Sequence, residues 1–105
     1  MTTLNLPNDG PLIATERDAS DIIGDAFGAG ADLVVIPAAR LSPEFFRLGT
    51  GLAGAVLQKF TNYHIRVAIV GDLTQYTDKS APLRDFVAES NRRGQVRFLA
   101  SEAVL

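Results

Sequence analysis

Most polar residues that could bind a ligand follow two short apolar segments of the chain, 33–36 and 65–70. They are Arg40, Asp72, Thr74, Tyr76, Thr77 and Lys79. If both segments are parallel strands, these side chains meet at the carboxyl-end rim of one sheet, where open α/β sheets bind their ligands. We expect Arg40 and Lys79 to hold a small anionic ligand there, with Asp72 as a base or a hydrogen-bond acceptor. Ordinary solvated loops are the competing interpretation.

The residues that most often carry catalysis are scarce in this chain. His64 is the single histidine, and there is no cysteine, so disulfides and thiol chemistry are excluded. No second group is evident that would pair with His64 as nucleophile or base. A zinc site would depend almost wholly on carboxylates, so no metal and no cofactor are predicted. No residue is assigned a catalytic role, and whether the chain is an enzyme stays open.

The segment 49–54 reads G-x-G-x-x-G, and Asp72 follows it at about the spacing found in dinucleotide-binding folds. That fingerprint should come directly after a strand and open a helix. Ser42 followed by Pro and Glu instead predicts that a helix has already begun, which places the glycines in its middle. A dinucleotide site is therefore not predicted.

Small residues in the same segment have a second interpretation. Thr50, Gly51 and Gly54 would let a sheet or the backbone of a partner approach closely, and we predict that they form an interface. Each glycine inside a helix costs roughly 1 kcal/mol relative to alanine, so a kink or a break near Gly49 is expected.

The elements that must position these residues are predicted from apolar periodicity and turn residues. Residues 2–6 and 11–15 are expected to form an N-terminal hairpin around the turn at 7–10. Helices are predicted from about 19, after a capping box at Thr15, over 42–63, and from about 81 to 93, where Ser80 stands as N-cap before Pro82 as Ser42 does before Pro43. Strands are predicted at 33–36, 65–70 and 95–99. Strands alternating with helices predict an α/β fold with a small, mostly parallel sheet and helices packed mainly on one face.

Length and composition are those of one ordinary domain, spanning 1–105, with 47% hydrophobic residues. The residues expected in its core are Ile36, Phe45, Leu52, Val56, Ile69 and Phe86. The net charge of −2 and the lack of a basic stripe argue against nucleic acid as a partner. Without a membrane-length apolar run or a signal-like segment at 1–6, the chain is predicted to be cytoplasmic and to bind no membrane.

Several blocks of sequence carry a resemblance. They are Phe45-Phe46, Thr50-Gly51-Leu52-Ala53-Gly54, Leu57-Gln58-Lys59-Phe60, Ala68-Ile69-Val70-Gly71-Asp72, Tyr76, Ser80, Leu83-Arg84-Asp85-Phe86 and Glu89-Ser90-Asn91. With these blocks in place, the chain resembles, over roughly residues 12–99, a bacterial family known as domain of unknown function 4180. The resemblance implies no particular activity.

The predicted order of elements also resembles the STAS fold of anti-sigma-factor antagonists and sulfate-transporter tails. Those regulators carry a phosphorylatable Ser or Thr at the start of a helix, and Ser42 stands in about that place. Pro43 and Glu44 replace the sequence that surrounds that site in the STAS proteins. We therefore predict that Ser42 acts as a helix N-cap.

Two hypotheses of function follow. The favoured one is a non-catalytic, STAS-like interaction or regulatory module that binds a protein partner or itself, as a homodimer. The alternative is a small-molecule binding protein or enzyme with a polar site at the carboxyl-end rim of the sheet.

Overall fold

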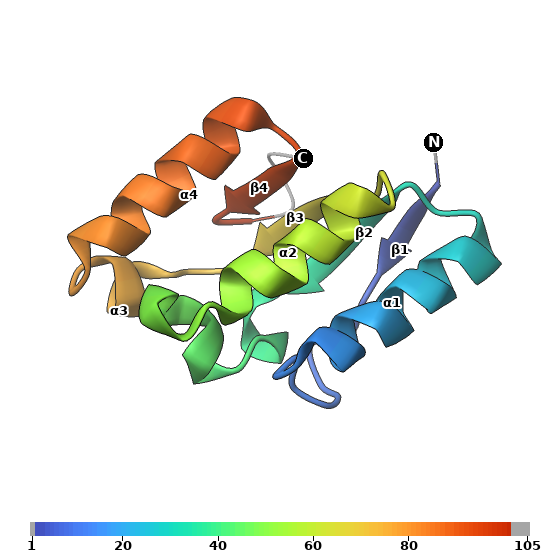
Figure 1. The fold of residues 1–105 in the computed structure, drawn as a ribbon, viewed down its shortest axis with the longest axis horizontal. Coiled ribbons are helices and arrows are strands. Elements are labelled where there is room, and N and C mark those ends of the chain that lie inside the picture. The colour runs from blue at the N-terminus through green and yellow to red at the C-terminus, as the bar shows by residue number, and fades with distance from the viewer. Residues whose placement is uncertain (1, 102–105) are drawn as a thin grey trace.

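Four parallel strands form one sheet, and their order across the sheet, β1-β2-β3-β4, is also their order in the chain (Figure 1). The computed structural model describes residues 2–101. The strands are β1 (Thr3–Asn5), β2 (Leu33–Pro37), β3 (Arg66–Val70) and β4 (Val96–Leu99). The helices are α1 (Glu16–Ala29), α2 (Leu52–Asn62), the single turn α3 (Thr74–Thr77) and α4 (Ala81–Arg93). Three short 3-10 turns join β2 to α2: η1 (Ala38–Arg40), η2 (Pro43–Phe46) and η3 (Leu48–Thr50).

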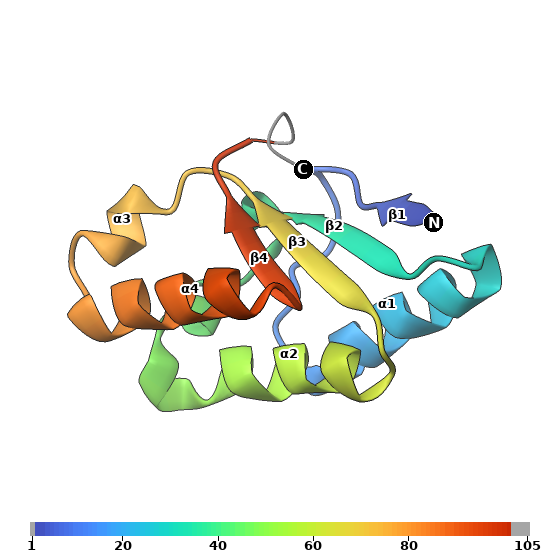
Figure 2. The ribbon, with the colours of Figure 1, turned by 90° about the horizontal axis from the view of Figure 1, so that it is seen from above.

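The three long helices lie on the same face of the sheet. Each new strand is added beside the previous one, and the crossover between parallel strands is right-handed almost without exception, so every crossover helix returns over the same face. Figure 2 shows α1, α2 and α4 together below the strands. The predicted α/β class, the parallel sheet and the placement of helices mainly on one face are confirmed.

The core lies between this face and the helices. Alternate strand residues point toward the helices and are buried, namely Val34, Ile36, Val67, Ile69, Val96 and Phe98. They pack with the apolar residues of α1 and α2, among them Ile22, Ile23, Ala26, Val56 and Phe60. The predicted burial of Ile36, Phe45, Val56 and Ile69 is confirmed. Leu52 and Phe86 are only partly buried, because Leu52 is the first residue of α2 and Phe86 packs against the edge of the core.

The predicted N-terminal hairpin is wrong. β1 pairs with β2 in parallel, with Leu4 beside Val34, and residues 11–15 form no strand. Ile13 instead makes an isolated parallel bridge to Leu41. The N–H of Ile13 donates to the carbonyl of Arg40 at 2.6 Å, and this position leaves Ile13 only 1% exposed. Burial of that side chain, which a solvent-facing hairpin would not provide, explains the difference.

The predicted helix over 42–63 is also wrong at its beginning, although the expected break is present. Two 3-10 turns occupy its first part, and α2 begins only after Gly51, whose φ of 77° lies in the left-handed region that favours glycine. The hydroxyl of Thr50 stabilises this arrangement, since it lies 2.9 Å from the carbonyl oxygens of Glu44 and Arg47 and accepts from the N–H of Leu52 at 3.2 Å.

Ser42 does not cap a helix, contrary to the prediction. Its side chain accepts no bond from the turn that follows, and the N–H of Phe45 donates instead to the backbone carbonyl of Ser42 at 3.0 Å. Where a long helix follows, the predicted caps are confirmed. The N–H of Leu83 donates to Oγ of Ser80 at 3.2 Å, and Thr15 with Asp18 forms a complete capping box at the start of α1.

We expect Asp18→Asn to lower the free energy of unfolding at neutral pH by about 1 kcal/mol, the usual size of a capping interaction. The N–H groups of Ala14 and Thr15 donate to Oδ2 of Asp18 at 2.9 and 3.0 Å. These bonds hold the pKa of Asp18 below its usual value, and the bond from Ala14 has the largest effect. A lowered folded-state pKa gives stability that is present above about pH 4 and is lost as the pH falls through the folded-state pKa.

Urea denaturation at pH 7 and below pH 3 measures this effect. The difference in the free energy of unfolding between the wild type and Asp18→Asn should be smaller at the lower pH. Asp21→Asn, on the same helix, is the control with the same change in net charge. An equal difference in the free energy of unfolding at both pH values would show that the carboxylate of Asp18 does not stabilise the fold through its charge.

Candidate functional site

A cavity of about 510 Å³ opens at the carboxyl ends of β2 and β3, where the sequence predicted a ligand site. We call it the rim cavity. Its lining residues are Asn8, Leu12, Pro37, Ala38, Ala39, Leu41, Pro43, Val70, Gly71, Asp72, Gln75 and Tyr76. Most of them are apolar, and the polar groups come from the segment before α1 and from the loop that follows β3. The cavity therefore offers an apolar body with a few polar groups, the usual character of a small-molecule site.

The predicted ligand residues are divided among several places. Asp72 and Tyr76 line the rim cavity. Lys79 lines a neighbouring cavity of about 370 Å³ together with Arg47. Arg40 lines a third cavity, of about 240 Å³, beside Asp18 and other acids of α1. The structure thus does not bring Arg40 and Lys79 together as the two cations of one anion site.

Arg40 has a structural role beside the rim cavity, which it does not itself line. The residue is 9% exposed, and its guanidinium donates from Nε to the carbonyl of Pro11 at 2.9 Å and from a terminal nitrogen to the carbonyl of Pro7 at 3.1 Å. These two bonds tie down the segment that contributes Asn8 and Leu12 to the cavity. The sequence pattern identified a cation near the rim but not its partners, which come from about thirty residues earlier in the chain.

The loop after β3 is ordered by its own hydrogen bonds. Oδ1 of Asp72 accepts from the N–H of Thr74 at 2.9 Å, and this bond, then one to the Thr74 side chain, holds the pKa of Asp72 below its usual value. Thr77 donates from Oγ1 to the carbonyl of Leu73 at 3.2 Å. Thr74 and Thr77 therefore shape the loop, while Asp72 remains an ionised carboxylate at the cavity.

Tyr76 joins the rim cavity to the core. Its ring stacks on Phe46, with centroids 4.1 Å apart and planes within 10°. Tyr76, Gln75 and Pro43 also line the neighbouring cavity that contains Lys79, so the two hollows share one wall.

The predicted interface residues lie at the start of α2, and only one of them borders a concave surface. A groove of about 220 Å³ runs between α2 and α4, and we call it the helix groove. Its lining residues are Gly54, Leu57, Gln58, Thr61, Phe86, Ser90, Arg93, Gln95 and Val96. Thr50 and Gly51 are exposed but shape the turn before α2. Sequence reasoning missed the α4 side of the groove, although Phe86, Ser90 and Arg93 stand at helical spacing along one face.

Gly54 has no packing role within the described part of the chain. A Cβ built on it would have no atom within 4 Å outside its own helix backbone. The expected close approach of the sheet is therefore absent, and the space beside Gly54 is open to the groove.

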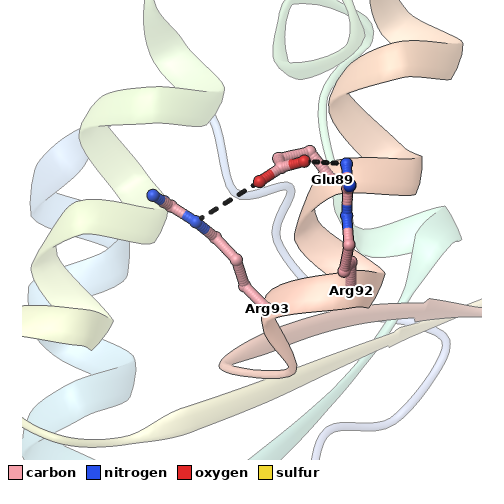
Figure 3. Close-up of polar contacts among 3 residues, drawn as sticks. All are labelled: Glu89, Arg92 and Arg93. Carbon is pink, nitrogen blue, oxygen red and sulfur yellow. Dashed lines mark hydrogen bonds and ion pairs between the residues drawn. The ribbon is translucent and has the colours of Figure 1, made fainter.

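Charged residues near the C-terminal end of α4 form a small network (Figure 3). Glu89 pairs with Arg92 and, at 3.6 Å, with Nε of Arg93. All three side chains are more than half exposed, so these pairs contribute at most about 1 kcal/mol. The network gives Arg93, which lines the groove, a partner in Glu89.

The remaining sequence candidates lie outside these sites. Gly49 and Gly51 precede α2 and Gly54 lies inside it, but β2 ends at Pro37, so no strand leads directly into these glycines as the dinucleotide fingerprint requires. Within residues 2–101, no three His, Cys, Asp or Glu side chains are grouped closely enough to hold a metal ion. None of the described helices has the length and apolarity that a membrane span requires.

The fold and its cavities define a small, all-parallel α/β protein with its helices on one face and a cavity at the carboxyl ends of the central strands. The chain belongs to the family described as Domain of unknown function (DUF4180), whose model matches residues 1–105. The resemblance seen in the sequence is thereby confirmed and extends over the whole chain. No curated protein and no solved structure matches the chain significantly.

Proposed function

We propose that the protein is a non-catalytic, cytoplasmic interaction module that binds a protein partner in the helix groove between α2 and α4. The observation that carries this proposal is Gly54, a glycine inside α2 with open space beside it. Glycine inside a helix costs roughly 1 kcal/mol relative to alanine. Gly24 in α1 is equally open but does not line the helix groove, whereas the missing side chain of Gly54 leaves room in that groove for a second molecule.

The chemistry of the groove defines the kind of partner. Leu57, Phe86 and Val96 supply an apolar floor, and Gln58, Thr61 and Ser90 supply an uncharged polar rim. Arg93 is already paired with Glu89. An amphipathic helix that presents an apolar, uncharged face fits this lining, in the manner of helix-in-groove recognition. We propose that this partner is a different protein. If the groove instead bound a second copy of the chain, the mass of the complex would show it.

The arrangement of the fold also supports an STAS-like regulatory role. The alternation of strands and helices after β1 and the placement of the helices on one face support it, although the N-terminal hairpin of the predicted order is absent. Ser42 is 2% exposed, so the proposed regulation does not use phosphorylation of Ser42 in the folded domain.

Gly54→Leu tests the proposal, since the added side chain fills the groove without a clash at Cβ. We expect the variant to lose its partner while its stability is unchanged or raised by about 0.5–1 kcal/mol, because leucine favours helix more than glycine. Native mass spectrometry of the untagged protein, purified gently from its own host, measures the bound partner, and thermal denaturation measures stability.

Gly24→Leu is the matched control. Gly24 lies inside α1 and also has no atom within 4 Å of a built Cβ, but it is not part of the helix groove. The control should keep the partner. A partner retained by Gly54→Leu, or lost equally in both variants, would refute binding in the groove.

A second function, small-molecule binding at the rim cavity, is favoured by the volume of that cavity. About 510 Å³ lies within the range of about 300–1,000 Å³ typical of ligand pockets. The same mass spectra would show a small bound mass on the protein. The rim cavity and the helix groove have different lining residues, so the test of small-molecule binding is independent of the test of partner binding.

A further inference from the structure

The rim cavity has an unbalanced charge. Asp72 carries the only side-chain charge among its described lining residues at neutral pH. The other polar side chains are the amides of Asn8 and Gln75 and the phenol of Tyr76. The rest of the lining is apolar. An anionic ligand, which the sequence alone suggested, would meet a carboxylate here and no cation.

We propose that the rim cavity binds a small organic amine as its ammonium ion, with Asp72 as the counter-ion and the apolar wall around the carbon skeleton. This inference rests on the second proposed function and names its ligand class. The amide oxygens of Asn8 and Gln75 supply further acceptors for ammonium hydrogens. The apolar wall, including Leu12, Leu41 and Val70, excludes water from the carbon atoms of the ligand.

The geometry of the loop after β3 keeps the carboxylate ready for a cation. Oδ1 of Asp72 is held by the N–H of Thr74, which orients the carboxylate and favours its charged form. The hydrogen bonds from the N–H and the side chain of Thr74 occupy only part of the acceptor capacity of a carboxylate, which has about four lone-pair sites. Asp72 can therefore serve the loop and the ligand together.

The two cations nearest in the sequence pattern do not compete for Asp72. Arg40 donates to the carbonyls of Pro7 and Pro11, in the segment that contributes Asn8 and Leu12 to the cavity. Lys79 lines the neighbouring hollow across the shared wall of Tyr76 and Gln75. Neither residue lines the rim cavity. A ligand ammonium is thus the complementary charge for this carboxylate.

A matched series of three probes tests whether the rim cavity prefers a positively charged ligand. The probes are 2-phenylethylamine, 2-phenylethanol and phenylacetate. They share one aromatic body and differ in carrying a positive, a neutral or a negative head. Titration into ¹⁵N-labelled protein, followed by amide chemical shifts, reports both affinity and place. Asp72 is exposed, and an exposed ion pair contributes little to affinity, so we expect the amine to bind about threefold to fivefold more tightly than the alcohol, with shifts at Gly71 and Gln75.

Asp72→Asn provides the second arm, because asparagine keeps an oxygen that can accept from the N–H of Thr74 and removes only the charge. We expect this variant to bind the amine no better than the alcohol. Asp85→Asn, an exposed position on α4 away from the cavity, should leave the preference unchanged.

Each other outcome overturns the inference in a distinct way. Equal affinity for amine and alcohol, or a preference that survives in Asp72→Asn, refutes the role of the carboxylate. Tighter binding of phenylacetate would show that the rim cavity is a ligand site but that it prefers an anion, contrary to the proposal. No binding of any probe would refute both the ligand class and small-molecule binding at the rim cavity, while the helix groove would be unaffected.

Discussion

Ser42→Asp is expected to lower the free energy of unfolding at neutral pH by about 3–5 kcal/mol. The side chain of Ser42 is 2% exposed, and its Oγ has no hydrogen-bond partner among the described residues. A carboxylate placed there would be a buried charge without a counter-ion, a defect that costs about 3–5 kcal/mol. The total stability of a domain is only about 5–15 kcal/mol, so this single substitution removes a large part of it.

The pH dependence of this variant has a definite sign. Burial disfavours the charged form of a carboxyl group and raises its pKa in the folded state above the unfolded value. A raised folded-state pKa means that the folded protein binds the proton more tightly, so Ser42→Asp should regain stability as the pH falls from 7 toward 4. Urea denaturation of the variant and the wild type at both pH values measures the difference.

Ser42→Ala is the control, and it should be neutral or stabilising by up to about 1 kcal/mol, since it removes a buried hydroxyl that lacks a partner. A Ser42→Asp variant as stable as the wild type at pH 7 would show that the site is open to water. The burial of Ser42 also bears on regulation, because a kinase could not reach this hydroxyl in the folded domain.

The second large effect is expected at Gly71, in the wall of the rim cavity. Its φ of 150° is unfavourable for any residue with a side chain, and a Cβ there would lie 2.8 Å from Cβ of Ala38. Backbone strain and overpacking each cost about 1–3 kcal/mol, so we expect Gly71→Ala to destabilise the protein by about 2–4 kcal/mol.

A double-mutant cycle with Ala38→Gly separates the two causes. Removing the Ala38 methyl group relieves the contact but not the backbone strain, so the double variant should recover part of the loss. Gly28→Ala in α1 is the matched control, since a Cβ there meets nothing within 4 Å, and its effect should be neutral or slightly stabilising. The absence of any recovery in the double variant would contradict the contact between the two residues.

Features that depend on neighbours in the chain were predictable from the sequence. The strands β2 and β3 were found because continuous β-branched runs fit a buried parallel strand. The caps at Thr15 and Ser80 were found because each side chain reaches an N–H only three residues away. The break before α2 was foreseen from the glycines around Gly51 for a similarly local reason.

Features that depend on distant partners were not predictable in the same way. The segment before α1 reads as half of a hairpin, yet Ile13 bridges Leu41 because burial against the loop after β2 outweighs the local turn signal. The start at Ser42 has the residues of a helix N-terminus, yet the chain forms only short 3-10 turns until Gly51. Local preferences are worth about 1 kcal/mol, and burial of a single large side chain outweighs them.

By itself, then, the sequence determined the α/β class, the parallel order of the central strands and the burial of Ile36, Phe45, Val56 and Ile69, because period and capping are encoded within a few positions. It also placed Asp72 and Tyr76 at the rim. Only the tertiary structure decided that Arg40 binds the carbonyls of Pro7 and Pro11, and that Lys79 lies in another hollow. The physical reason is that the charge of a cavity depends on which long side chains point into it, and the packing of the whole domain sets those directions.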